Sequence, residues 1–158
     1  MTDEYLSWVN NKEVKKYLEI NSNSFSMLEL KKYVEKTLLS SSSVFLAIED
    51  AISGKHIGNI KLGPIDYKHN NAPIGIMIGD KNYWGRGIAS EAIMLLSDYA
   101  FRELHLHKIY AGFYSLNIAS MKTFLKSGFS QEARLVEHCL YEGRYIDKVY
   151  LSKLNPNG

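Results

Sequence analysis

The sequence predicts an α+β (mixed α/β) domain in which helices cover a mixed sheet. Apolar residues repeat at helical spacing in some segments and alternate or run together, as in strands, in others. The predicted elements follow the order helix, β-hairpin, strand, helix, strand, helix, β-hairpin, which places helices on a mixed sheet. Residues 1–158 contain 46% apolar and 23% charged side chains, without an internal repeat or a domain boundary. We therefore expect a single globular domain.

The N-terminal part is expected to hold helices followed by a hairpin. Residues 2–19 are typical of two short helices broken at Asn10-Asn11, where an asparagine can cap the second helix. Ser26-Met-Leu-Glu29 matches a capping box. The helix that it starts has an apolar stripe at helical spacing: Met27, Leu30, Val34 and Leu38. Residues 44–48 and 55–62 are expected to pair as a hairpin.

The C-terminal part alternates strands and helices. Residues 74–78 form a short apolar run suited to a buried strand, and residues 108–114 alternate as a second strand. Between them lies a helix with a predicted core face: Ala89, Ile93, Leu96, Ala100 and Leu104. Residues 117–127 predict another helix. Residues 134–141 and 144–151 are expected to pair across a two-residue turn.

Charge and cysteine content exclude several classes of protein. The net charge is +2 and the pI is near 8.5, which fits an anionic ligand, and no run of Lys and Arg indicates a nucleic-acid partner. Cys139 is the single cysteine, so neither an internal disulfide nor a cysteine-rich metal site is expected. No apolar stretch approaches 18 residues and the polar N-terminus does not resemble a signal peptide. We expect no membrane contact and a cytoplasmic location.

The segment from Ile74 to Ile93 predicts an anion site. It runs from the apolar strand through Gly79, Gly85 and Gly87 into an amphipathic helix. Glycines allow backbone N–H groups to approach a phosphate, and the N-terminus of a helix favours negative charge. The segment lacks both the Gly-Lys-Ser/Thr of a P-loop and the Gly-x-Gly-x-x-Gly of a dinucleotide fold. The alternative is an ordinary glycine-rich turn.

Several motifs along most of the chain resemble one family. Trp84-Gly-Arg-Gly-Ile-Ala89 resembles the pyrophosphate loop of the GNAT N-acetyltransferases, Arg/Gln-x-x-Gly-x-Gly/Ala. Asn117-Ile-Ala-Ser120, followed by Gly128-Phe129, is similar to the second signature of that superfamily. Gly143-Arg-Tyr-Ile-Asp147 and the segment that starts at Trp8 resemble the RimJ/RimL-like branch, which acetylates the N-termini of ribosomal proteins.

The resemblance implies a central mixed, mostly antiparallel sheet flanked by helices, with two splayed parallel strands that hold acetyl-CoA and with no metal. The implied coenzyme-binding residues are Ile76, Met77, Ile78, Trp84, Gly85, Arg86, Gly87, Ile88, Ala89, Ser90 and Asn117. Each has a simpler alternative. Ile76 to Ile78 could be plain core residues, Arg86 a solvated arginine, and Asn117 a helix N-cap. In addition, the strand that usually precedes the first GNAT helix has no counterpart here. Either the sequence is truncated before this strand, or the sheet edge is open or pairs with a second copy, as in a homodimer.

The catalytic acid and base are where the sequence departs from the family. Phe124 and Gly112 stand where many GNAT enzymes carry a tyrosine acid and a glutamate base. Ser120 is implied as the group that protonates the departing thiolate; the alternative is a first-turn serine bonded within its helix. Glu137 is the best remaining carboxylate, because alternation along a strand puts it on the face of Cys139, the third base position. Its alternative is an exposed strand glutamate.

The implied reaction is direct attack of a primary amine on the thioester of acetyl-CoA. The acceptor is expected to be a protein N-terminus or the amino group of a nucleotide-linked sugar. A polyamine, an antibiotic amine and a non-catalytic acyl-CoA-binding regulatory role are the alternatives. The acceptor pocket is expected to be formed by the first two helical segments, the loop of residues 63–71 and the turn of residues 141–145. The residues expected to contact the acceptor are Trp8, Tyr141 and Tyr145.

Overall fold

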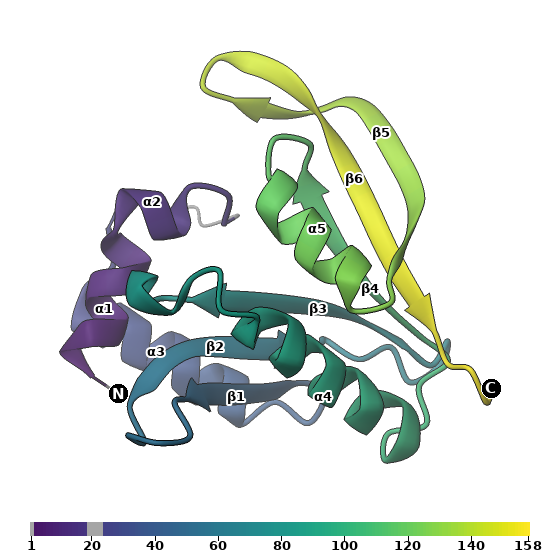
Figure 1. The fold of residues 1–158 in the computed structure, drawn as a ribbon, viewed down its shortest axis with the longest axis horizontal. Helices are drawn as coiled ribbons and strands as arrows, with labels where there is room; N and C mark the ends of the chain where they lie inside the picture. Colours follow the sequence, from purple (N-terminus) through teal and green to yellow (C-terminus); the bar gives the residue numbers. More distant parts are fainter. Residues whose placement is uncertain (1, 19–23) are drawn as a thin grey trace.

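The computed structural model describes residues 2–18 and 24–158, which form one six-stranded sheet with helices on both faces (Figure 1). Within this part of the chain the strand order is β1-β2-β3-β4-β6-β5, and β3–β4 is the parallel pair of a sheet that is otherwise antiparallel. The predicted mixed fold is confirmed. The elements are α1 (Asp3–Asn10), α2 (Lys12–Lys15), α3 (Met27–Leu38), β1 (Val44–Glu49), β2 (His56–Leu62), β3 (Asn71–Ile78), the 3-10 helix η1 (Lys81–Tyr83), α4 (Ile88–Arg102), β4 (Lys108–Tyr114), α5 (Ile118–Lys126), β5 (Ser130–Tyr141) and β6 (Arg144–Leu154).

Capping side chains explain where the first helices begin. The Asn11 side chain accepts hydrogen bonds of 2.9 and 3.3 Å from two backbone N–H groups in the first turn of α2, so α2 starts as soon as α1 ends. Ser26 starts α3 through the predicted capping box with Glu29, whose carboxylate accepts from the Ser26 backbone N–H at 2.8 Å. The two helices predicted within residues 2–19 are confirmed, while Glu19 lies outside the described residues.

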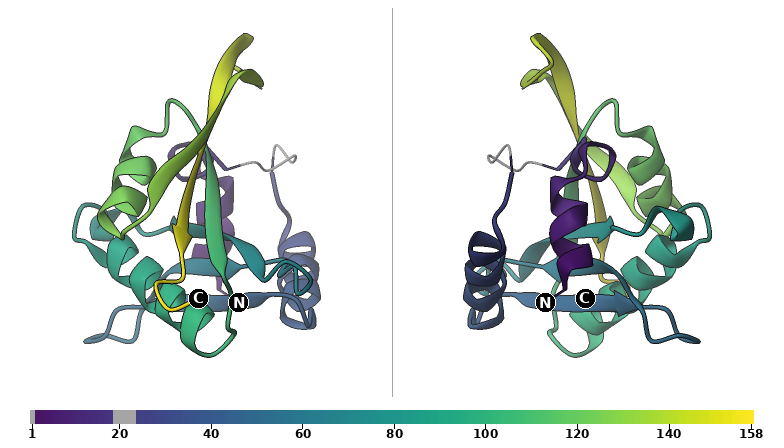
Figure 2. Two further views of the ribbon diagram at one scale, coloured as in Figure 1. Left: turned by 90° about the vertical axis from the view of Figure 1, so that its right-hand side faces the viewer. Right: turned by 90° about the vertical axis from the view of Figure 1, so that its left-hand side faces the viewer.

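Two apolar cores lie on opposite faces of the sheet. Figure 2 shows the helices that cover these two faces. The larger core lies under α4 and α5 and includes the fully buried Ile93 and Ala100 from the predicted face of α4. The smaller core lies under α1 and α3, and its buried residues are Tyr5, Trp8, Val9 and Leu30. The predicted stripe on α3 does not extend to Leu38, which is 62% exposed, because α3 packs on this core through Leu30 and Val34.

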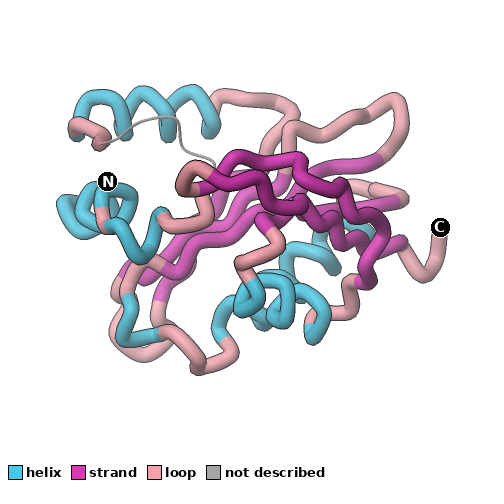
Figure 3. Tube along the Cα trace, turned by 90° about the horizontal axis from the view of Figure 1, so that it is seen from above, coloured by secondary structure: helices cyan, strands magenta, loops and turns pink. Residues whose placement is uncertain are grey.

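The sheet opens between its two parallel strands. β3 and β4 are paired over three residue pairs that end at Pro73–Tyr110. Beyond that point β3 stays paired with β2 up to Ile78, and β4 stays paired with β6 up to Tyr114. Proline has no N–H to donate to a ladder, so Pro73 is a natural place for the pairing to end. The strands then diverge, and seen from above they lie between the helices of the two faces (Figures 1 and 3).

The C-terminal hairpin is longer than predicted and irregular. β5 and β6 pair with a register shift between Leu135 and Cys139, and Glu137 within that stretch has a φ of 49°. A β-bulge interrupts the alternation of side chains along a strand. Glu137 therefore does not share the face of Cys139 as predicted: Glu137 is exposed, whereas Cys139 is half-buried. The backbone N–H of Glu137 donates to the Asp147 carboxylate at 2.8 Å.

Candidate active site

The turn that leads into α4 has the geometry of an anion site. Gly85 and Gly87 have φ values of 74° and 83°, which only glycine adopts readily. Gly87 is the N-cap of α4, and no side chain caps the first turn of that helix. A Cβ added to either glycine would meet no atom within 4 Å. The first N–H groups of a helix lack partners within the helix, so this open turn presents donors and the positive end of the helix dipole to a ligand.

A cavity of about 740 Å³ adjoins this turn and is called the α4–α5 groove below. It lies between β3, the turn, the first residues of α4 and the helix α5, and it reaches α2. All the predicted coenzyme-binding residues line this groove except Arg86. The segment from Ile74 to Ile93 and the Asn117–Ser120 motif, which are separate in the sequence, thus line one continuous site.

Side-chain contacts within the turn explain the exception. The Trp84 indole N–H donates to the Ile78 carbonyl at 2.8 Å, which ties the turn to the end of β3. The Arg86 guanidinium lies over the Tyr83 ring, 5.1 Å from its centroid. Arg86 therefore stacks on an aromatic ring of η1. Arg86 is exposed and does not line the groove, which fits the solvated arginine considered as the alternative from the sequence.

The described lining of the groove carries more lysines than carboxylates, so its net charge is positive. Lys16, Lys122 and Lys126 line it, and the hydrogen bond with Tyr17 raises the pKa of Lys16. Glu13, the one carboxylate in this described lining, pairs with Lys81 at 2.7 Å, and this contact lowers its pKa. Sequence reasoning missed the two lysines of α5. Their four-residue spacing, which puts them on one helix face, was the available signal.

Asn117 and Ser120 lie side by side at the start of α5, and both line the groove. The Asn117 side chain caps α5 by accepting from the Ser120 backbone N–H at 3.4 Å. Capping, the simpler alternative for Asn117, is thus present, and it leaves the amide N–H groups of Asn117 for another partner. Phe124 is 1% exposed and packs between Phe113 and Phe129 at 5.0 Å from each ring. The position of the family's tyrosine acid is therefore part of the apolar core.

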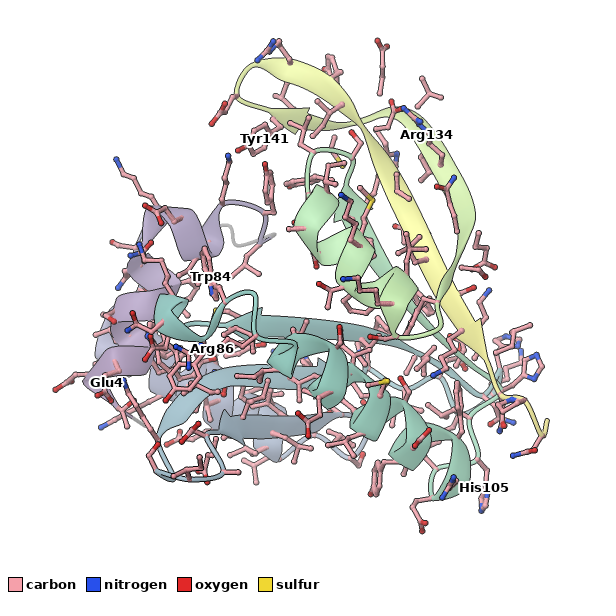
Figure 4. The ribbon with its side chains drawn as sticks, viewed as in Figure 1. Glu4, Trp84, Arg86, His105, Arg134 and Tyr141 are labelled. Carbon is pink, nitrogen blue, oxygen red and sulfur yellow. The ribbon has the colours of Figure 1, made fainter. Side chains whose placement is uncertain are left out.

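The residues predicted to contact the acceptor are dispersed. Trp8 is 7% exposed, its ring lies against Gly79 and 5.0 Å from His56, and it lines neither described cavity. The Tyr141 ring lies 5.8 Å from that of Tyr17, which lines the groove, whereas Tyr145 is 67% exposed. Burial is the main cause that raises the pKa of Tyr141. Figure 4 shows Tyr141 on the hairpin, across the opening from Trp84.

A second cavity, of about 530 Å³, lies on the opposite face of the sheet between α1, α3 and the strands β1 to β3. It is called the α1–α3 cavity below. Both cavities are lined by Leu18, Ile76 and Met77, so they adjoin at the open end of β3. Of the loop of residues 63–71, which was predicted to form the acceptor pocket, Gly63 alone belongs to the described lining of the α1–α3 cavity. The turn of residues 141–145 contributes no residue to that lining. The residues that α3, β1 and β2 contribute to this cavity were not predicted from the sequence.

Neither a cluster of metal ligands nor a membrane-spanning helix is present in the described part of the chain. No group of three or more His, Cys, Asp or Glu side chains in residues 2–18 and 24–158 is placed to hold a metal ion. In the same ranges, every helix is too short or too polar to cross a membrane.

The family is decided by comparison with known proteins. Residues 2–130 match the family model for an acetyltransferase (GNAT) domain. The chain belongs to this acetyltransferase family. It is an acetyl-CoA-dependent N-acetyltransferase, and the open turn, the α4 N-terminus and the splayed strands fit acetyl-CoA as its cosubstrate. The predicted GNAT fold and enzyme class are confirmed.

Similar proteins include characterised and uncharacterised acetyltransferases. The chain is 32% identical to the probable N-acetyltransferase YjcK of Bacillus subtilis over 142 residues, which cover 89% of this chain and 76% of the relative. It is 32% identical to the spermidine N(1)-acetyltransferase of Vibrio cholerae over 139 residues, covering 87% and 78%. A crystal structure of the Vibrio cholerae spermidine N-acetyltransferase in complex with CoA and spermine superposes with a TM-score of 0.84 at 29% identity, covering 97% and 88%.

Proposed function

We propose that the acetyltransferase moves the acetyl group of acetyl-CoA directly to the primary amine of a small molecule. The observation that carries this proposal is the adjacency of three features along one groove. These are the open glycine turn, the uncapped start of α4 and the unpaired edge of β3 beyond Pro73. The turn and α4 suit the pyrophosphate, and the unpaired edge suits the amides of the coenzyme arm. Lys122 and Lys126 supply positive charge for further phosphate groups.

In this proposal the amine nitrogen attacks the acetyl carbonyl carbon, the carbon–sulfur bond breaks, and coenzyme A leaves as the thiolate. A backbone N–H of Ile76 to Ile78 stabilises the oxyanion. The amine loses its proton to water, Ser120 protonates the thiolate, and the serine hydroxyl regains a proton from that water. Holding amine and thioester in reacting geometry supplies roughly 7–11 kcal/mol, so a strong general base is not essential. Glu137, the carboxylate considered as a base, is exposed and is not assigned that role in this proposal.

Two acceptor classes have separate support. A polyamine is favoured by the relatives, because the similar Vibrio cholerae enzyme is a spermidine N(1)-acetyltransferase whose crystal structure contains CoA and spermine. An amine with a neutral or anionic body is favoured by charge. Apart from Lys122 and Lys126, which this proposal assigns to the coenzyme phosphates, the described lining of the two cavities holds two lysines, Lys16 and Lys61. Its one carboxylate, Glu13, is already paired. A polycation would be repelled by such a lining. Protein N-termini, suggested by the RimJ/RimL-like motifs, and nucleotide-linked amino sugars are further members of the second class. We also propose that the enzyme is cytoplasmic and forms a homodimer.

The test is release of free thiol from acetyl-CoA by the purified protein with a panel of amines. The panel contains spermidine, a peptide with a free N-terminus, an amino-sugar nucleotide and an aminoglycoside. Mass spectrometry of the product locates the acetyl group. The proposal predicts turnover with a small-molecule amine. Turnover of peptides alone would overturn the small-molecule part, and hydrolysis without an acetylated amine would overturn the transfer itself.

A further inference from the structure

The floor of the α1–α3 cavity is open at Gly75. This glycine lies within β3 between two isoleucines, where β-branched residues are otherwise favoured. A Cβ added to Gly75 would meet no atom within 4 Å, and Gly75 is exposed. The neighbouring side chains therefore do not require a glycine there. A glycine inside a strand often marks a place where a ligand approaches the backbone closely.

Lys61 faces the same opening. It is the register partner of Gly75 on β2, and it is half-buried. Its ammonium lies 5.8 Å from the centroid of the Tyr33 ring. Among the described residues that line the α1–α3 cavity, Lys61 is the one charged side chain. A lysine that points into a mainly apolar cavity without a carboxylate in the described lining is suited to hold an anionic group of a ligand.

Asn59 supplies an unused donor in the same wall. The side chain is 7% exposed, and its Oδ1 lies 3.2 Å from Nε2 of His56, which lies 2.8 Å from the Gly58 carbonyl. A carbonyl only accepts, so this His56 nitrogen carries the proton and Asn59 turns its oxygen toward it. The Asn59 Nδ2 is then buried without a hydrogen-bond partner among the described residues. A buried amide in this state favours a ligand that brings an acceptor atom to it.

We propose that the α1–α3 cavity holds the body of the acceptor and that this body carries an anionic group, a carboxylate or a phosphate, bound by Lys61 with Asn59 as a second donor. This inference rests on the proposed acetyl transfer to a small-molecule amine. The middle of the acceptor lies among apolar and aromatic side chains such as Val9, Phe45 and Met77. Its amine reaches the coenzyme where the two cavities adjoin at the end of β3.

The first test compares acceptors of matched length and opposite charge. Gly75 and Met77 are two residues apart on β3, about 7 Å, so a chain of roughly six carbons spans from Lys61 to the shared end of the cavities. Aminohexanoate, hexanediamine and hexylamine differ only in the group at the far end. We expect kcat/KM for aminohexanoate to exceed that for hexanediamine by about tenfold or more. Glucosamine phosphate against glucosamine tests phosphate as the anionic group. A preference for the diamine and for unmodified glucosamine would overturn the proposal.

The second test changes the cavity. Lys61→Met should lower kcat/KM for the anionic acceptor by about 10- to 100-fold while leaving hexylamine nearly unchanged, because the charged contact is lost and the apolar stem is kept. Lys61→Arg should retain most of the preference. The exposed Lys36→Met on α3 is the matched control. Gly75→Val should reduce turnover of every acceptor without changing the Kd for acetyl-CoA, because its side chain fills the opening. An equal loss for all acceptors in Lys61→Met would contradict the proposed role of Lys61.

A binding measurement separates this inference from the proposed function. Calorimetry with hexanoate and with hexylamine, without acetyl-CoA, reports on the cavity alone. Binding of hexanoate that is lost in Lys61→Met and kept in Lys61→Arg supports the cavity even if no amine in the panel is acetylated. If amines are acetylated but hexanoate does not bind, or binds equally to Lys61→Met, the cavity proposal is overturned and the transferase proposal stands.

Discussion

The α4–α5 groove and the α1–α3 cavity adjoin on the same strand, yet they are built from different parts of the chain. The groove depends on backbone features: two glycines with positive φ, the start of one helix and the unpaired edge of β3. The cavity depends on side chains from α1, α3 and three strands. The groove can therefore bind the same coenzyme with many different side chains around it. The cavity changes its ligand whenever one of its side chains changes.

The largest effect should come from a change in the backbone site. Gly87→Glu should weaken acetyl-CoA binding by about 100-fold or more, because it puts a side chain at a φ of 83° and a negative charge beside the phosphates. Calorimetric titration measures the Kd. Gly143→Glu is the matched control, since Gly143 also has positive φ (76°) and open space around it, but it lies in the hairpin turn. Equal affinities in Gly87→Glu and the wild type would rule out the turn as the pyrophosphate site.

A second comparison distinguishes Gly79, which packs against Trp8 after the end of β3, from Gly75, which is proposed to face the ligand. An added Cβ at Gly79 would overlap the buried indole ring of Trp8, so Gly79→Ala should lower the free energy of unfolding by about 2 kcal/mol. Gly75→Ala is the control, because its Cβ meets open space and alanine suits the strand better than glycine. Urea denaturation of both variants gives the comparison. If Gly79→Ala is as stable as the wild type, Trp8 is free to move, and its predicted contact with the acceptor regains support.

The same difference explains what the sequence could predict. The glycine turn, Asn117 and Ser120 are read from short contiguous motifs, and the structure brings them to one groove. Trp8 and Glu137 illustrate the opposite case. Whether a tryptophan binds a ligand or fills a core depends on distant residues such as Gly79, and whether a strand residue faces a site depends on a bulge that leaves no clear pattern in the sequence.

The fold was more predictable than the cavity, because periodicity and capping act locally. Ser26 and Asn11 mark helix starts, and their hydrogen bonds are those that the residue types suggest. Predicting the cavity would have required the strand register that places Lys61 opposite Gly75, and this register is a property of the folded sheet. A partial signal was present: Asn59 and Lys61 alternate with apolar residues on β2, so they share one face.

A smaller effect is expected at the start of α5, in the α4–α5 groove. Ser120→Ala should lower kcat by about tenfold with little change in KM, because protonation of the thiolate strengthens only in the transition state. Ser120→Thr should recover most of the activity by restoring the hydroxyl. Steady-state kinetics with the best amine measures both parameters. A wild-type kcat in Ser120→Ala would remove Ser120 from the reaction and leave it as a first-turn residue of α5.

The smallest effect is expected for Asp80, which lies between the end of β3 and the glycine turn. Asp80 is 8% exposed, pairs with Lys55 at 2.7 Å and accepts from the Asn82 N–H at 3.0 Å. Lys55 is the main cause that lowers the pKa of Asp80 from its ordinary value of 3.8. A carboxylate whose pKa is lower in the folded state stabilises the fold above its unfolded pKa, and this stabilisation is lost as the pH falls through the folded pKa. Asp80→Asn should therefore lower Tm by about 3 °C at pH 7, and the difference from the wild type should shrink below about pH 4.

The matched control for Asp80 is the Glu13–Lys81 pair, which has the same length of 2.7 Å but is exposed on both sides. Exposed pairs contribute little, so Glu13→Gln should leave Tm nearly unchanged. Thermal melts of both variants from pH 3 to pH 7 complete the test. If Glu13→Gln and Asp80→Asn have equal effects, burial does not distinguish the two pairs, and the glycine turn is held by its backbone and by the Trp84–Ile78 hydrogen bond rather than by Asp80.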